Sequence, residues 1–418
     1  MKKLKKKNKP NKPYFRIINK ILFLLFIFLL STQLGKHFFP SFSYLNGVRV
    51  DYLSPTLYLT DILVVLLFFL NFNTVVDFFK NKKVLIGLSL LFINAVLAKN
   101  QPVALYQLIR IVEFLIIFSL SSILFKVIKE KTILVVLLLT SSFQFLLVVL
   151  QLVYRQSIQG VFYWFGERLF NLSTPGIAKA SLKGIEFLRP YGTFSHPNSL
   201  AGFFLLLYFY VLVDRKFEKY FLLKSLCLFI FSVLILLSFS KVAILTYLIL
   251  NTFYFMRNTK VTCRICWLSR IIIPIIISFL FLQAVTDPLT LEKRIGLFKN
   301  SLEIISQHPV LGVGIGNYLI AQSVFASKYF LFFNQPVHNI FLLFIAETGI
   351  LGGAVIISFL FKPVYRIIKN NPYIIFVVFL TGFFDHYWLT LMQNWLVLAL
   401  VYGSVSSSFF ISRFNLRS

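Results

Sequence analysis

The stretch TILVVLLLTSSFQFLLVVLQLVY, residues 132–154, runs through more than twenty residues without a charged side chain. An apolar run of about 18 residues or more is long enough to cross the hydrocarbon core of a bilayer as a helix. Similar runs recur along the 418-residue chain, which is 58% hydrophobic and 13% charged and has a mean hydropathy of +0.83. A transmembrane β-barrel would instead show segments of about ten residues with alternating polarity. The sequence therefore predicts an all-α polytopic membrane protein, in which the helices satisfy their own backbone hydrogen bonds.

Twelve apolar runs along the chain are predicted to span the membrane. They cover 17–35, 55–74, 84–98, 103–125, 132–154, 198–213, 221–239, 241–256, 271–286, 338–361, 373–388 and 389–411. The third run is short and the last two nearly touch, so eleven or thirteen spans are alternatives. The basic N-terminus followed by an apolar run could pass for a signal peptide, but no small-residue cleavage pattern follows it. We expect that run to remain as the first span.

The distribution of basic residues predicts the orientation. The chain has 42 Lys and Arg against 14 Asp and Glu, a formal net charge of +28. In a soluble protein this charge would suggest nucleic acid, but here most basic residues flank apolar runs, which indicates an anionic membrane surface. With both termini in the cytoplasm, the short inner segments hold two thirds of the Lys and Arg, as the positive-inside rule requires. Two long segments, about 155–197 and 287–337, are then extracytoplasmic.

The first long outer segment ends in RPYGTFSHPN, residues 189–198, at the start of the sixth predicted span. Pro197 suits the first turn of a helix, and Ser195 or His196 is then the cap. A helix N-terminus attracts anions, and the guanidinium of Arg189 can hold a phosphate in a planar fork. The segment is predicted to bind a phosphate or pyrophosphate, with His196 and Asn198 beside the ligand. The alternative is an ordinary helix start whose arginine reaches the lipid headgroups.

The second long outer segment begins with an amphipathic pattern. Apolar residues recur at helical spacing from Leu291 to Ile305, which predicts a helix lying on the membrane, with Arg294 among its polar residues. Gly312, Gly314 and Gly316 follow in a GxGxG pattern. No strand precedes this pattern, so we expect a tight turn over the membrane and no dinucleotide site.

Further polar residues lie at or near the predicted outer face. His338 opens the tenth span and can take a proton from a hydroxyl, although a lone boundary histidine is more often structural. Lys241, in a tight turn, is a possible second cation beside Arg189. Asp385 and His386, in the turn before the last span, could orient another side chain or bind a sugar hydroxyl. For Lys241 and for this pair, a plain polar turn is the alternative.

Two further features concern the interior and the inner side. Glu347, deep in the tenth span, is costly in lipid unless paired, and Arg110 in the fourth span is a candidate partner with a structural or relay role. Cys227 lies in an apolar run and needs no special role. Cys263 and Cys266 form a lone CxxC, whereas a zinc site needs two more ligands, which are not evident nearby.

The ordered motifs resemble the O-antigen ligase and polymerase superfamily. The resemblance rests on RxxGTFxHPN at 189–198, RxG…HPxLGxG at 294–314 and HNxxLxxxxExGILG at 338–352. It predicts a core at 188–355 containing the large outer loop 287–337, N-terminal spans and a first outer loop at 1–187, and C-terminal spans at 356–418. Relatives often carry arginine in the turn that holds Lys241 here, so the role of Lys241 in phosphate binding is the weakest correspondence.

The resemblance implies a glycosyltransferase in the cytoplasmic membrane of a bacterium, acting on its outer face with an undecaprenyl-pyrophosphate-linked glycan as donor. It implies no metal and no cofactor, and the partners are the lipid-linked donor, a lipid, glycan or protein acceptor and membrane lipids. Arg189 and Arg294 would hold the pyrophosphate, with Lys241 as a possible third cation, and His338 would activate the acceptor hydroxyl.

Several functions remain alternatives at this point. A ligase makes a single transfer to an acceptor, whereas a polymerase joins lipid-linked repeat units; the motifs do not separate them, and we lean towards the ligase. A lipid-linked glycan flippase would carry charges along a central path through several spans, and the mid-span charges here are few. A scaffold of an envelope assembly complex would not need the ordered Arg189, Arg294 and His338. A peptidoglycan glycosyltransferase of the shape-and-division type would lack these motifs.

Overall fold

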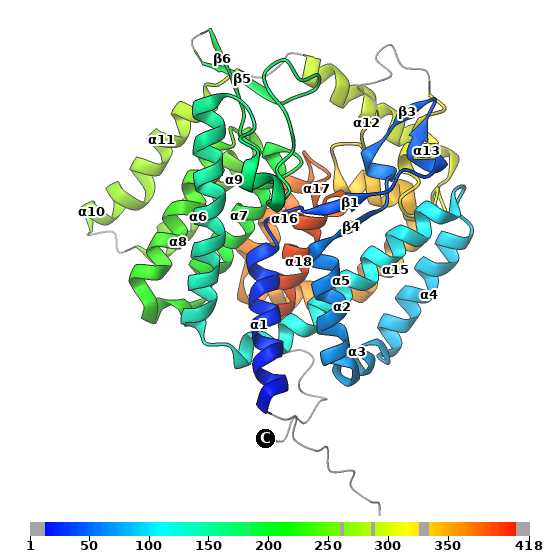
Figure 1. Cartoon of the computed structure of the whole chain (residues 1–418), viewed down its shortest axis with the longest axis horizontal. Helices are drawn as coiled ribbons and strands as arrows, with labels where there is room; N and C mark the ends of the chain where they lie inside the picture. Colours follow the sequence, from blue (N-terminus) through cyan, green and yellow to red (C-terminus); the bar gives the residue numbers. More distant parts are fainter. Residues whose placement is uncertain (1–12, 183, 260–262, 286–288, 326–333, 407–418) are drawn as a thin grey trace, which may run out of the picture.

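A computed structural model describes residues 13–182, 184–259, 263–285, 289–325 and 334–406. The described chain is a bundle of helices with three small two-stranded antiparallel sheets (Figure 1). The sheets pair β1 (Gly35–His37) with β4 (Thr56–Tyr58), β2 (Tyr44–Leu45) with β3 (Val48–Arg49), and β5 (Lys179–Leu182) with β6 (Ile185–Leu188). The predicted all-α class is thus confirmed for the bundle, with small sheets added in the connections.

Each of the twelve predicted spans contains helix, because long uncharged runs favour a backbone that bonds to itself. The first six correspond to α1 (Pro13–Leu29), α2 (Leu59–Leu70) with α3 (Phe72–Phe79), α4 (Lys82–Val96), α5 (Gln101–Val127), α6 (Glu130–Tyr154) and α7 (Pro197–Val213). The others correspond to α8 (Phe221–Leu237), α9 (Lys241–Asn258), α11 (Ile273–Leu282), α15 (Ile340–Asn370), α16 (Pro372–Gly382) with α17 (Tyr387–Thr390), and α18 (Met392–Val405). The short helix α13 (Tyr318–Gln322) and the longer α12 (Leu289–Gln307) lie in connections, whereas the short helix α10 (Arg264–Trp267) continues through the π-helical turn Leu268–Ile272 into α11.

Length and composition are sufficient for membrane crossing in only part of this set. Among the described residues, five helices are long and apolar enough, and α2 with α3 forms a sixth if that pair, bent by 92°, is one span. Helices α7, α16 and α18 are apolar but shorter. A membrane protein is therefore supported, and the count of twelve crossings stays a prediction.

Helix α7 forms the centre of the bundle. Its sequence from Leu200 to Leu212 is apolar on every side, and all of these residues are buried. A helix that is hydrophobic all round belongs in a core, and α7 packs against α8, α16 and α18 (Figure 1). Gly202 lets α17 approach closely, because a Cβ there would overlap the ring of Tyr387. The N-terminal end of α7 is thereby held against the turn that precedes α17.

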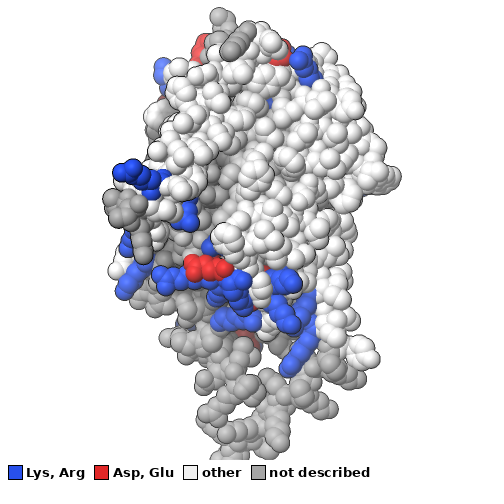
Figure 2. All heavy atoms as spheres, turned by 90° about the vertical axis from the view of Figure 1, so that its left-hand side faces the viewer, with Lys and Arg blue, Asp and Glu red and all other residues white. Residues whose placement is uncertain are grey.

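The two ends of the bundle differ in character. Helix α1 begins at the lower end in Figure 1, whereas β5, β6 and α12, which belong to the two predicted outer segments, lie at the upper end. Figure 2 shows one side of the molecule, where Lys and Arg side chains gather towards the lower end below a broad surface almost free of charge. This distribution agrees with the basic inner segments of the sequence, and the side of the membrane that each end faces stays a prediction.

Helix α12 confirms the predicted helix, but its buried face differs from the predicted apolar face. The side chains buried against the protein are Leu297, Ser301 and Ile304. The predicted stripe, which includes Leu291 and Phe298, is exposed. The helix thus presents one face to the protein and a second apolar face outward, as a helix at a membrane surface would.

The GxGxG turn packs against a break in α15. Gly349 has φ +67° inside α15, and the N–H groups of Ile350 and Leu351 donate to the carbonyls of Pro309 and Val310. In the other direction, the N–H groups of Val313 and Gly314 donate to the carbonyls of Ala346 and Glu347. The predicted tight turn is present, and it fixes the end of α12 to the middle of α15.

Gly349→Ala is expected to destabilise the fold by at least about 1–3 kcal/mol, the cost of forcing a side chain into this backbone region. A Cβ at this position would also overlap the carbonyl of Val310. Thermal unfolding in detergent measures the effect. Gly353→Ala is the control, because its Cβ would lie 3.8 Å from Phe344, an ordinary contact, in the same helix. Equal stability of the two variants would contradict the assignment.

Candidate active site

The segment that precedes α7 is held by two buried glutamines from α6. Gln151 Oε1 accepts from the N–H groups of Tyr191 and Gly192, and Gln151 Nε2 donates to the Gly192 carbonyl. Gln144 Nε2 donates to the hydroxyl of Thr193 at 2.7 Å. Gly192 has φ +56°, and a Cβ there would overlap Gln144, so glycine is needed at this position. The backbone between Arg189 and the helix is therefore rigidly placed.

His196 is the N-cap of α7, one of the two caps predicted. Its Nδ1 accepts from the N–H of Asn198 at 3.1 Å, so the proton of the neutral ring is on Nε2. Burial, reinforced by the charge of Arg189, lowers the pKa of His196 to about 3. His196 is therefore neutral at physiological pH. Its side chain occupies the N-terminus of α7, where the sequence predicted a bound anion.

Two hydrogen bonds and one longer ionic contact join Arg189 to His338. Arg189 Nη2 donates to Asn198 Oδ1 at 2.7 Å, and Asn198 Nδ2 donates to Asp385 Oδ2 at 2.7 Å. Asp385 Oδ1 lies 3.6 Å from His338 Nδ1, which makes no hydrogen bond in the described chain. Residues from three distant parts of the sequence are thus gathered at the N-terminal end of α7.

The charged members of this line are buried. Burial lowers the pKa of Arg189 to about 10, opposed by Tyr191 and Asp385, so the guanidinium stays charged at physiological pH. Burial alone would raise the pKa of Asp385, but the nearby His338, with the other neighbouring histidines, holds this pKa well below its usual range. Asp385 is therefore a carboxylate positioned to stabilise a positive charge on His338.

His386 lies beside His338 with its ring held in place. Its Nδ1 lies 2.8 Å from the Thr390 hydroxyl, and its ring centroid is 5.1 Å from that of His338. The same hydroxyl donates to the His386 carbonyl at 3.2 Å, an arrangement that favours the proton on Nδ1 and a free lone pair on Nε2. Burial lowers the pKa of His386 to about 3, although Asp385 opposes the shift. The ring is a neutral polar group facing the site.

Arg294 reaches the same turn from α12. Its Nη1 donates to the Phe384 carbonyl at 3.2 Å, and its Nε is buried without a partner in the described chain. Arg189 is anchored differently, since its Nε donates to the Ser238 carbonyl at 3.1 Å. The structure thus brings Arg294 next to Asp385 and His386, as a pyrophosphate site would require.

Lys241 is not drawn into this group. It is the first residue of α9, and its side chain is exposed. The described residues give it no hydrogen bond or ion pair. The connection to the site runs instead through the backbone of the same turn, where Ser238 accepts from Arg189.

The predicted pairing of Glu347 with Arg110 is wrong. Arg110 Nη1 lies 2.8 Å from both Asp61 and Glu113, and its other nitrogens donate to Tyr106 and to the Thr56 carbonyl. Glu347 accepts from the backbone N–H groups of Gly316 and Tyr318. Arg110 pairs with Glu113 in its own helix and with Asp61 at the start of α2. Glu347 forms its hydrogen bonds with the glycine turn instead.

Tyr52 is a site residue that the sequence analysis missed. It lies in the 3₁₀ turn Asp51–Leu53, and its ring centroid is 5.5 Å from that of His386, edge to face. A lone tyrosine in a connecting segment carries no pattern, so only the fold could place it.

The group combines histidine and carboxylate side chains with the two guanidinium groups of Arg189 and Arg294. His338, Asp385 and His386 offer ligand atoms within 4.8 Å of one another, and two histidines with a carboxylate can hold a transition metal. The carboxylate already accepts from Asn198 and from the His386 N–H, and the charges of Arg189 and Arg294 act on these residues. These features oppose a dication and favour an anionic ligand.

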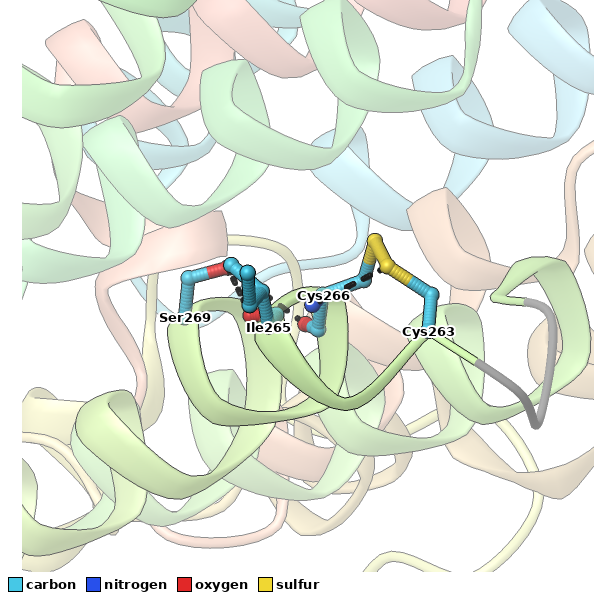
Figure 3. The surroundings of a disulfide bond; sticks show 4 residues. All are labelled: Cys263, Ile265, Cys266 and Ser269. Carbon is cyan, nitrogen blue, oxygen red and sulfur yellow. Dashed lines mark hydrogen bonds between the residues drawn. A yellow bond between two sulfur atoms is a disulfide. The ribbon is translucent and has the colours of Figure 1, made fainter.

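Two cysteines outside this group are joined. Cys263 and Cys266 form a disulfide at the start of α10, with Cα atoms 5.3 Å apart (Figure 3). Cys263 is also the N-cap of this helix, and its Sγ accepts from the Cys266 N–H. The CxxC thus links one helical turn at the left-hand edge of Figure 1. Cys227 is buried and free, as its apolar run indicated.

Comparison with protein-family models matches residues 226–357 to the O-antigen ligase family. This segment is an O-antigen ligase domain. The resemblance to the O-antigen ligase and polymerase superfamily is confirmed, and with the apolar helices it makes the chain a membrane protein of glycosyltransferase-like type. A search of the curated proteins finds no match.

The O-antigen ligase domain supplies only part of the site. It begins within α8 and ends within α15, about a third of the chain, and it includes Arg294 and His338. Arg189, Asn198, Asp385 and His386 lie outside it, on elements that pack against it. The predicted boundaries at 187 and 355 stay a prediction, since the match begins at a different residue.

Proposed function

We propose that the protein transfers a glycan from an undecaprenyl-pyrophosphate donor to an acceptor hydroxyl, on the outer face of the cytoplasmic membrane of a bacterium, in the manner of an O-antigen ligase. The observation that carries the proposal is the line from Arg189 through Asn198 and Asp385 to His338, with Arg294 at the same turn. It combines a base, a carboxylate that stabilises its protonated form and two guanidinium groups for phosphate.

The reaction is a displacement at the anomeric carbon. The acceptor oxygen forms a bond to this carbon while His338 takes the hydroxyl proton, and the bond from the carbon to the pyrophosphate oxygen breaks. Asp385, 3.6 Å from Nδ1, stabilises the imidazolium, so Nε2 is the nitrogen that accepts the proton. The electron pair leaves with the lipid pyrophosphate, whose charge Arg189 and Arg294 offset. Tyr52 and His386 are placed to contact the sugar.

The test is transfer by the purified full chain in lipid nanodiscs. The donor is a lipid-pyrophosphate-linked glycan, candidate acceptors are added in turn, and a chelator is present. A single transferred glycan supports the ligase, whereas a ladder of repeat units supports a polymerase. Dependence on an added transition metal would instead make His338, Asp385 and His386 metal ligands. Flipping of the donor across vesicles without transfer would replace the enzyme by a transporter.

Arg189→Ala is expected to lower kcat by about 10²–10³-fold, the usual loss when one group that stabilises developing negative charge is removed. Arg189→Lys should recover little, because a point charge cannot bond Asn198, the Ser238 carbonyl and a phosphate at once. Rates of the three proteins are compared after size-exclusion chromatography shows equal folding. Full activity of the alanine variant would remove Arg189 from the donor site.

A further inference from the structure

The site as described has less positive charge than its proposed ligand needs. Arg189 and Arg294 each carry one positive charge, Asp385 carries one negative charge, and His196 and His386 are neutral. These groups sum to about one positive charge, and to about two once His338 has taken the acceptor proton. A sugar-linked lipid pyrophosphate carries about two negative charges and the departing lipid pyrophosphate about three. Buried phosphate charge is costly unless paired, so a further cation is expected at the site.

The side chain of Arg168 lies next to this group of residues. It lies in the first long outer segment, and its Nη1 donates to the Ser195 carbonyl at 3.1 Å, directly before His196. Its charge acts on Tyr52, which contacts His386, and on Tyr191, on which Arg189 also acts. The charges of Arg168 and Arg189 therefore both act on one tyrosine in the segment that precedes α7.

The backbone of Arg168 is held rigidly by its neighbour. Glu167 is buried, and its carboxylate accepts from Gln151 Nε2 at 2.8 Å and from the N–H groups of Ile158 and Gln159 at 2.9 and 2.6 Å. Gln151 is the same residue that holds Tyr191 and Gly192. One buried glutamine thus fixes both arginine-bearing segments relative to each other, as pre-organised phosphate binding requires.

The guanidinium of Arg168 has N–H donors that form no hydrogen bond within the described residues. It is exposed, one of its N–H groups is used by the Ser195 carbonyl, and within the described ranges no carboxylate pairs with it. Unpaired arginines with fixed positions are suited to bind phosphate through two parallel hydrogen bonds. Lys241, the third cation expected from sequence, is exposed and is not joined to the site by its side chain.

We propose that Arg168 is a third phosphate-binding cation, which holds the pyrophosphate of the lipid-linked donor together with Arg189 and Arg294. This inference rests on the proposed function and names one residue more for its donor site. Arg168 lies outside the O-antigen ligase domain, so the donor site extends into the outer segment that precedes α7.

The test measures binding of inorganic pyrophosphate to the purified full chain at low ionic strength by isothermal titration calorimetry. Arg168→Gln removes the charge but keeps an N–H group for the Ser195 carbonyl. We expect its Kd to rise about tenfold or more, the loss of one charge-assisted contact. Arg168→Lys should recover part of the affinity. Lys241→Gln is the matched control on the other cation and should change Kd less than about twofold.

Three outcomes overturn the inference: wild type that does not bind pyrophosphate, Arg168→Gln that binds as wild type does, or Arg168→Lys that binds no better than the glutamine variant. The last would make Arg168 a support for Ser195 only. Kinetics separate this inference from the proposed function. In the transfer assay, Arg168→Gln should raise KM for the lipid-linked donor and leave KM for the acceptor unchanged. Transfer that is independent of Arg168 keeps the function and rejects the inference, whereas Arg168-dependent pyrophosphate binding without any transfer rejects the function and keeps the anion site.

Discussion

His338→Ala is expected to lower the transfer rate by about 10²–10⁴-fold, the usual contribution of a general base in the transition state. Asp385 lies 3.6 Å from His338 Nδ1, and without the imidazole it has no proton acceptor to stabilise. The loss should fall on kcat, since the two arginines and the donor contacts remain. Single-turnover transfer with saturating donor and acceptor measures it.

The control for this variant is His308→Ala. His308 is exposed in the turn after α12, and none of the described hydrogen bonds uses its side chain. The His308→Ala variant should therefore transfer glycan at the wild-type rate. Asp385→Asn supplies a second check, because an amide keeps the size of the side chain but loses the charge that stabilises imidazolium. A His338→Ala enzyme as fast as wild type, or one that loses only donor affinity, would make His338 a binding residue.

Arg110→Met is expected to destabilise the fold by about 3–5 kcal/mol, the usual cost of removing one partner from a buried ionic group. Arg110, Asp61 and Glu113 are all buried, and the second oxygen of each carboxylate, which does not contact Arg110, has no hydrogen-bond partner among the described residues. Removal of the guanidinium leaves two carboxyl groups facing each other in a medium of low dielectric. Thermal unfolding in detergent, followed by circular dichroism, measures the loss.

A compensated variant separates charge from packing in this cluster. Adding Asp61→Asn and Glu113→Gln to Arg110→Met removes the unpaired acids, so most of the lost stability should return. Glu347→Gln should not rescue Arg110→Met, because Glu347 bonds to the Gly316 and Tyr318 N–H groups instead. If Glu347→Gln did restore the stability of Arg110→Met, the pairing of Arg110 with Glu347 that the sequence predicted would be correct after all.

The helices could be predicted closely, because the requirement that lipid places on a chain is local. A run such as residues 132–154 has to bond to itself, and α6 occupies Glu130–Tyr154. The cap of α7 was also predictable, because proline in a first turn leaves few choices for the residue before it. The break in α15 at Gly349 was harder to predict. Backbone groups displaced from the helix at this break form hydrogen bonds with the glycine turn at 309–314 instead, a contact between segments that are distant in the sequence.

The sequence named several residues that the structure brings together but not the contacts between them, and the roles of these residues stay predictions. His338, Arg189 and Arg294 were singled out by motif, but the link through Asn198 to Asp385 spans nearly two hundred residues of sequence. Arg110 was given the wrong partner because sequence spacing cannot show that the start of α2 lies against α5. Tyr52 and Arg168 carried no pattern at all, since a single aromatic or basic residue in a connection is common in any protein.

The sequence by itself determined that this chain is a membrane bundle of helices and that residues 226–357 match the O-antigen ligase family. Both follow from information local to each segment, namely hydropathy over one run and residue types at short spacing. Only the tertiary structure decided which charges meet. Electrostatic and hydrogen-bonding partners are set by distances of a few ångströms between elements far apart in the chain, and those distances depend on how α5, α7, α15 and the turn at Asp385 pack together.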